Sequence, residues 1–123
     1  MNKRDPKLTV LLFNECINNH DRKKIAQYMA DDYLFIDRSN NNYEGKESNV
    51  KGWGEFFDQF PDYKNIFPKL ESRDNIVFIP GCSTCSYEPL DGPAIWVAKV
   101  ENDPIAEWRI YDDTVKNRKK LGV

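Results

Sequence analysis

The sequence predicts an α+β domain in which a curved antiparallel sheet packs against helices on one side. In the first half of the chain, apolar residues recur at helical spacing, as Leu8, Leu11 and Leu12 do. From Tyr63 onward, the pattern changes to short, β-prone apolar runs that are separated by turn residues. Spacers this short leave no room for helical crossovers, so these later strands are expected to form an antiparallel meander.

Three helices are expected before the sheet. Asp5 is a good N-cap and Pro6 suits the first helical position, so the first helix begins there and continues through Ile17. Asp21 caps a second, shorter helix that extends to Met29. The third helix covers roughly residues 46–60, and its buried stripe contains Val50, Trp53, Phe57 and Phe60.

One strand is expected between the second and third helices, at residues 33–37, after a polar turn at residues 30–32. Residues 38–44 contain three consecutive asparagines and are expected to form a loop. The remaining strands are predicted at residues 63–70, 76–87, 94–100 and 105–111. Residues 115–121 are expected to form a C-terminal helix.

Length and composition describe one soluble domain that comprises residues 1–123. Hydrophobic residues make up 40% of the chain, and 20 acidic residues nearly balance 18 basic ones. This balance gives no global field that would attract nucleic acid or an anionic membrane. No apolar signal segment or membrane-spanning run is present, and three cysteines suit a reducing compartment, so we expect a cytoplasmic protein.

Asp37 is the first candidate for chemistry. Side chains alternate along a strand, so Tyr33, Phe35 and Asp37 share one face. A carboxylate beside two aromatic residues either lies at a rim or points into an apolar pocket, where desolvation would tune its pKa for general-base work. The alternative interpretation is that Asp37 only caps the loop that follows the strand.

Other motifs give no metal or cofactor site. His20 is the only histidine and lies in a predicted turn, and Cys82 and Cys85 point to opposite faces of a predicted strand. The glycines do not fit a phosphate-binding loop, so we expect neither a metal nor an organic cofactor. Three tryptophans, six tyrosines and seven phenylalanines favour a flat, apolar small molecule as the ligand.

Several segments carry a resemblance to a known family. These are Asn18 to Asp21, Ala30-Asp31-Asp32 through Asp37, Gly45, Phe60-Pro61-Asp62, and Ile105 to Tyr111 with Asp113, Leu121 and Gly122. In this order they resemble the SnoaL-like polyketide cyclases of the nuclear transport factor 2-like superfamily, which also contains ketosteroid isomerase. The resemblance covers nearly the whole chain. It implies a cone-shaped fold, in which a strongly bent sheet wraps a long helix around an apolar cavity.

The resemblance also implies roles for two aspartates. Asp37 matches the proton-shuttling base of ketosteroid isomerase, and Asp113 matches the acid/base of the cyclases. Asp113 has an alternative role as the N-cap of the C-terminal helix. Phe13 stands where the isomerase places an oxyanion-hole tyrosine. Trp96 falls near the position of that enzyme's second oxyanion donor, a protonated acid. Steroid isomerisation by the known mechanism is therefore not expected.

The sequence thus leads to two functional hypotheses. The chain binds a small apolar or polycyclic carbonyl compound in an enclosed cavity, where Asp37, Asp113 or both catalyse cofactor-free isomerisation or cyclisation. The alternative is a non-catalytic ligand-binding or dimerisation module, because this fold hosts both kinds of function. The family also leads us to expect a homodimer through the outer sheet face. The expected ligand-contacting residues are Phe13, Tyr33, Phe35, Trp53, Phe57, Trp96, Arg109 and Tyr111.

Overall fold

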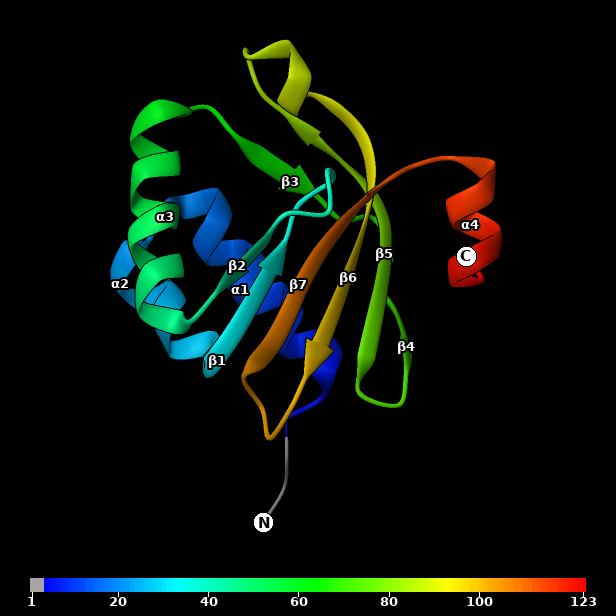
Figure 1. The fold of residues 1–123 in the computed structure, drawn as a ribbon, viewed down its shortest axis with the longest axis horizontal. Helices are drawn as coiled ribbons and strands as arrows, with labels where there is room; N and C mark the ends of the chain where they lie inside the picture. Colours follow the sequence, from blue (N-terminus) through cyan, green and yellow to red (C-terminus); the bar gives the residue numbers. More distant parts are fainter. Residues whose placement is uncertain (1–3) are drawn as a thin grey trace.

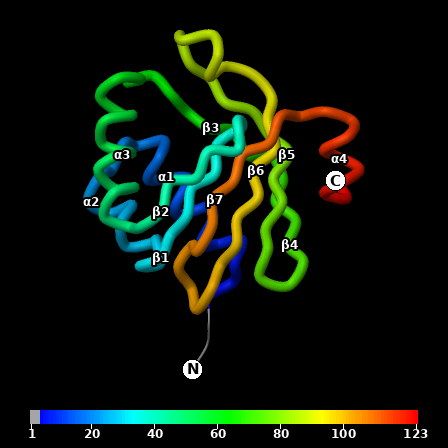
Figure 2. Tube along the Cα trace, in the orientation of Figure 1, coloured from blue at the N-terminus to red at the C-terminus, as the bar shows by residue number. Residues whose placement is uncertain are grey.

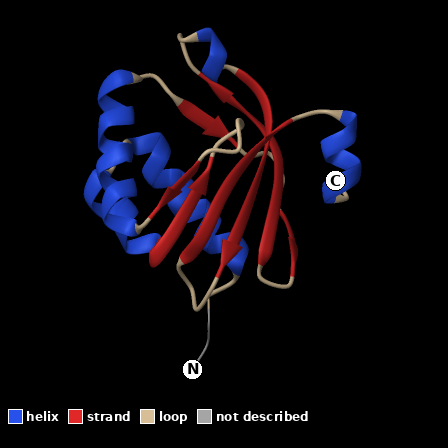
Figure 3. Ribbon diagram, viewed as in Figure 1, coloured by secondary structure: helices blue, strands red, loops and turns tan. Residues whose placement is uncertain are grey.

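A computed structural model describes residues 4–123 as a curled sheet with three helices on one side and one on the other. In Figure 1, α2 and α3 lie on the left and α1 runs behind the strands, whereas the C-terminal α4 stands alone on the right. Figure 3 shows the same separation by element type. The predicted α+β class is confirmed.

The helices begin where the sequence predicts. In α1 (Pro6–Asn19), the Asp5 carboxylate accepts a hydrogen bond from the Lys7 amide, and His20 ends the helix in a left-handed conformation with φ 54°. Asp21 caps α2 (Arg22–Ile25), which continues as the 3₁₀ turn η1 (Ala26–Tyr28). The remaining helices are α3 (Lys46–Gln59) and α4 (Val115–Leu121).

Seven strands form one sheet in the order β2-β1-β7-β6-β5-β3, and β4 pairs with β5. Their bounds are β1 Met29–Ile36, β2 Asn42–Glu44, β3 Lys64–Ile66, β4 Glu71–Arg73, β5 Ile76–Thr84, β6 Gly92–Val100 and β7 Ile105–Asp112. A further 3₁₀ turn, η2 (Glu88–Leu90), joins β5 to β6. The later strands pair antiparallel as expected, but β1 and β7 run parallel. These two strands are far apart in sequence, so no short spacer constrains their relative direction (Figure 2).

Some strand boundaries differ from the prediction. The expected polar turn at residues 30–32 belongs to β1, and β2 and β4 form in segments that were expected to be a loop and a turn. Every residue of β2 and β4 is exposed, so neither strand has the apolar alternation that reveals a strand in a sequence. The strand expected at residues 63–70 is only Lys64–Ile66, and Pro68, which has no N–H group, interrupts the rest of that segment.

The main core lies between the inner face of the sheet and the N-terminal helices. Its largest fully buried side chains include Trp96 and Trp108 from the sheet and Phe13 from α1. A smaller cluster on the outer face contains Phe78, Ile95 and Val97, with Leu121 of α4 packed against it. The two faces of the sheet are therefore covered by different helices.

Candidate ligand-binding cavity

A cavity of about 530 Å³ opens at one end of the sheet, between the end of β1, α3 and η2. Its rim is exposed at Ser39, Tyr43 and Ser48, whereas Asn49 and Tyr63 are buried. The hollow is thus open on one side, in contrast to the enclosed cavity that we expected. The lining residues are Phe35, Asp37, Arg38, Ser39, Tyr43, Ser48, Asn49, Gly52, Trp53, Phe56, Tyr63, Pro89, Leu90 and Ile110.

Two periodicities bring these side chains together. Phe35 and Asp37 share a face of β1 and its extension, because alternate residues of a strand point the same way. Along α3, Asn49, Gly52 and Phe56 are spaced three and four residues apart and therefore lie on one side of the helix. The cavity forms where this helix face meets the end of the sheet.

Five aromatic residues line the cavity. Phe35 stacks against Tyr43 at 5.6 Å between ring centroids, and Trp53 meets Phe56 edge-on at 5.6 Å. Phe56 in turn contacts Tyr63 at 4.9 Å. The ring faces and edges make this wall largely apolar, which suits a ligand with an apolar ring system.

Asp37 lies at the rim, and its carboxylate accepts hydrogen bonds from the loop that follows it. Its Oδ1 accepts hydrogen bonds from the amides of Ser39 and Asn41, both at 2.9 Å. Its Oδ2 accepts from Asn41 Nδ2 at 3.1 Å and from the Tyr43 hydroxyl at 3.2 Å. Partial burial alone would raise the pKa of Asp37, but these hydrogen bonds outweigh it and lower the pKa. Asp37 is therefore ionised at neutral pH, and its basicity is reduced.

Three other polar groups lie around the cavity. Arg38 donates to Asp112 Oδ1 at 3.1 Å, so the cation at the rim is paired. The hydrogen bond to Asp37 raises the pKa of Tyr43, and burial raises the pKa of Tyr63 to about 12. Both phenols therefore stay protonated at neutral pH, and the Tyr43 hydroxyl already donates to Asp37.

Below the cavity, the cone is filled with side chains. The Phe13 ring packs 4.8 Å from Trp108 and 6.0 Å from Tyr33, and all three residues are fully buried. Phe67 packs on Trp96 at 4.9 Å. The hollow that the fold family implies is thus confined to its mouth in this chain.

The structure brings together only some of the residues expected at the site. Asp37, Phe35 and Trp53 line the cavity. Four others lie in the core outside its lining, namely Phe13, Tyr33, Phe57 and Trp96. Arg109 and Tyr111 pair with Val97 and Ile95, which belong to the outer-face cluster, so they face away from the cavity.

Asp113 also lies outside the cavity lining. Arg118 binds its carboxylate through two nitrogens, at 2.6 and 2.9 Å, and this hydrogen bonding lowers the pKa of Asp113. The residue that caps α4 is Thr114, whose side chain accepts from the Asn117 amide. The two aspartates proposed as catalytic therefore do not share a cavity, and their catalytic assignment remains a prediction.

Sequence reasoning missed several residues of the lining. Asn49 and Phe56 could have been found, because they lie on the same side of α3 as Trp53. Ile110 shares a face of β7 with Trp108, but the sequence did not show that this face is the inner one. Pro89 and Leu90 gave no signal, because the turn that holds them at the cavity is positioned by contacts distant in sequence.

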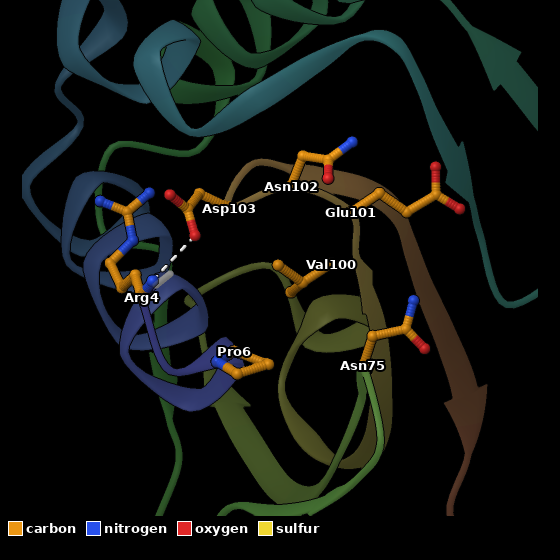
Figure 4. A pocket seen from close by; sticks show the side chains of 7 residues that line it. All are labelled: Arg4, Pro6, Asn75, Val100, Glu101, Asn102 and Asp103. Carbon is orange, nitrogen blue, oxygen red and sulfur yellow. Dashed lines mark hydrogen bonds between the residues drawn. The ribbon is translucent and has the colours of Figure 1, made fainter. Parts of the chain in front are cut away.

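A second hollow, of about 360 Å³, lies at the opposite end of β6 and β7 (Figure 4). It is lined by Arg4, Pro6, Asn75, Val100, Glu101, Asn102 and Asp103. The Arg4 amide donates to Asp103 Oδ1 at 2.9 Å, which ties the start of the chain to the β6–β7 turn. This hollow has few apolar walls and shares no lining residue with the first.

Two kinds of feature are absent from residues 4–123. No helix in this range is both long and apolar enough to cross a membrane. No group of three or more His, Cys, Asp or Glu side chains within the same range could hold a metal ion.

A curled sheet that encloses helices, with an aromatic cavity at its mouth, defines the nuclear transport factor 2-like class of domains. The profile of the SnoaL-like domain family matches residues 10–114, and the chain belongs to this family. No curated protein matches it significantly.

Solved structures support the same fold. An LEH-like epoxide hydrolase from M. tuberculosis has a TM-score of 0.77 at 15% identity, over 88% of this chain and 82% of that one. A protein assigned as a SnoaL-like polyketide cyclase from Shewanella putrefaciens has a TM-score of 0.75 at 15% identity, over 95% and 85%. An NTF2-like protein of unknown function from Cytophaga hutchinsonii has a TM-score of 0.75 at 15% identity, over 99% and 98%. At such identities the likeness concerns the fold alone.

Proposed function

We propose that this protein binds a small, flat, largely apolar molecule in the cavity at the mouth of its sheet. The observation that carries the proposal is a hollow of about 530 Å³ whose walls include Phe35, Trp53, Phe56 and Leu90. Its size lies within the range of about 300–1,000 Å³ that is usual for small-molecule sites. Polar groups at the rim, such as Asp37 and Ser48, can orient a ligand whose body is apolar.

Gly52 offers a direct test of binding. It lines the cavity, and a Cβ at this position would meet nothing within 4 Å. Gly52→Leu should fill part of the hollow and weaken binding of 2-acetylnaphthalene at least tenfold in equilibrium dialysis. The matched variant Gly52→Ala should keep binding within about twofold, because one methyl group occupies little of the space. Equal affinities of the wild type and Gly52→Leu would refute this location of the site.

Acid–base turnover at Asp37 is the second candidate function. The supporting observation is that the Asp37 carboxylate lines the cavity and is ionised at neutral pH, as a general base must be. Its four hydrogen bonds weaken it as a base, and for this reason we place binding first. Deuterium exchange into the methyl group of 2-acetylnaphthalene, followed by NMR, tests turnover. Exchange should be faster with the wild type than with folded Asp37→Asn, and equal rates would exclude Asp37 as the base.

A further inference from the structure

Three buried polar groups lie on the inner face of the sheet, next to residues that line the cavity. Tyr33 precedes the lining residue Phe35 by two positions on β1, and Trp108 precedes Ile110 by two on β7. Trp96 pairs with Ile110 from the adjacent β6. Within residues 4–123, Tyr33 Oη and the indole nitrogens of both tryptophans are buried without a hydrogen-bond partner.

Among these groups, Tyr33 most needs an explanation. A hydroxyl that is buried without a partner has lost its water and gained nothing, and proteins leave few groups in that state. Phenylalanine would fill the same space without this penalty. Burial also raises the pKa of Tyr33, so its phenol remains a protonated donor at neutral pH.

Trp53 lies against this phenol and also lines the cavity. Its side chain lines the hollow and approaches Tyr33, and its ring lies 6.1 Å from that of Phe13. Gly52, the preceding residue of α3, leaves open space on the cavity side. A ligand in the cavity can reach Tyr33 Oη only if the indole turns away from its ring contacts with Phe35 and Phe56.

We propose that Tyr33 Oη donates a hydrogen bond to an oxygen of the bound ligand when the Trp53 side chain turns aside. The inference rests on the proposed ligand-binding function and narrows the ligand class. The ligand has a planar apolar body and carries a neutral acceptor, such as a ketone oxygen, at the end that enters first. A neutral acceptor fits, because the buried polar residues within 4–123 include no Lys or Arg that could balance a charge.

The test compares two probes of similar shape, 2-acetylnaphthalene and 2-ethylnaphthalene, which differ by a carbonyl in place of a methylene. Tyr33→Phe should weaken binding of the acetyl probe about three- to tenfold, as expected for one neutral hydrogen bond. It should leave the affinity for the ethyl probe unchanged. The melting temperature of Tyr33→Phe should equal or exceed that of the wild type, because an unpaired buried hydroxyl has been removed.

Tyr28→Phe is the matched control, since it removes the hydroxyl of another buried tyrosine, one that does not line the cavity. This variant should not discriminate between the probes. Equal effects of Tyr33→Phe on both probes, or no effect on either, would overturn the inference and leave the proposed function standing. Failure of the wild type to bind either probe would overturn the proposed function together with this inference.

Discussion

Asp37 holds the loop that follows β1, and its carboxylate is occupied by four hydrogen-bond donors. Two are the backbone amides of Ser39 and Asn41, so the side chain fixes the path of the chain from β1 towards β2. The same loop supplies Arg38 and Ser39 to the cavity rim. The two interpretations of Asp37, loop cap and cavity residue, are therefore compatible.

Asp37→Asn should destabilise the fold by about 1–2 kcal/mol, because an amide group would turn a donor towards atoms that are themselves donors. The matched control is Asp31→Asn, which removes the same charge from an exposed position on β1. Urea unfolding at pH 7 measures both variants. Equal stabilities of the two variants would show that the Asp37 hydrogen bonds contribute little.

The difference between wild type and Asp37→Asn should depend on pH. Because the pKa of Asp37 is lower in the folded state, its carboxylate stabilises the fold above the unfolded pKa of about 4. This contribution is lost as the pH falls through the folded pKa. Urea unfolding at pH 7 and near pH 3 should therefore show a smaller difference at the lower pH. A difference that stays constant would mean that ionisation is not involved.

Some site residues are positioned by local strand geometry and could be predicted, whereas others depend on how the strands pair. The shared face of Phe35 and Asp37 follows from strand alternation, so the sequence alone predicts it. The outward direction of Arg109 and Tyr111 could not be predicted, because alternation tells which residues share a face but not which face meets the helices. Only the pairing of β7 with β6 and β1 decides that.

Among the secondary-structure elements, the close approach of β3 to β5 explains why residue 81 is a glycine. A Cβ on Gly81 of β5 would lie 2.6 Å from the carbonyl oxygen of Ile66 in β3, and 3.5 Å from the Trp96 ring. Gly81 therefore lets the end of β3 approach β5 closely where the two strands pair at the edge of the sheet. Since the obstructing atom belongs to the backbone, a side chain here cannot be accommodated by a simple rotamer change.

Gly81→Ala should lower the free energy of unfolding by about 1–3 kcal/mol, which is typical of overpacking in a core. Gly52→Ala is the control, because the same methyl group enters open space on α3 and should raise stability by up to about 1 kcal/mol. Thermal and urea unfolding of both variants measure these changes. Opposite signs are expected, and a neutral Gly81→Ala would contradict the close contact.

Elements that bury an apolar face could be located from the sequence, whereas fully exposed ones could not. The helices α1 and α3 and the strands β5 to β7 each carry an apolar pattern, and each was predicted within a few residues. β2 and β4 carry no such pattern, since their residues are exposed and backbone pairing alone defines them. The parallel pairing of β1 with β7 also escaped prediction, because it depends on the closure of the whole sheet.

At the scale of the whole molecule, α4 decides how much of the outer sheet face is open to another chain. Leu121 of this helix packs against the cluster of Phe78, Ile95 and Val97. Arg73 of β4 reinforces the contact, since its guanidinium lies 3.8 Å from the Phe78 ring centroid and donates to the Leu121 carbonyl. The homodimer expected through the outer face stays a prediction. Such a dimer would have to use the part that α4 leaves uncovered, or else displace this helix.

Leu121→Asp should detach α4, because it places a charge against an apolar cluster. We expect this variant to lose about 1–2 kcal/mol of stability and to self-associate more strongly than the wild type, since a contiguous apolar patch becomes exposed. Val115→Asp is the matched control, because Val115 lies on the same helix and its side chain is 72% exposed. Sedimentation velocity at micromolar concentrations should show larger species for Leu121→Asp and no change for Val115→Asp. If Leu121→Asp instead dissociates a wild-type dimer, α4 is part of the interface rather than a cover over it.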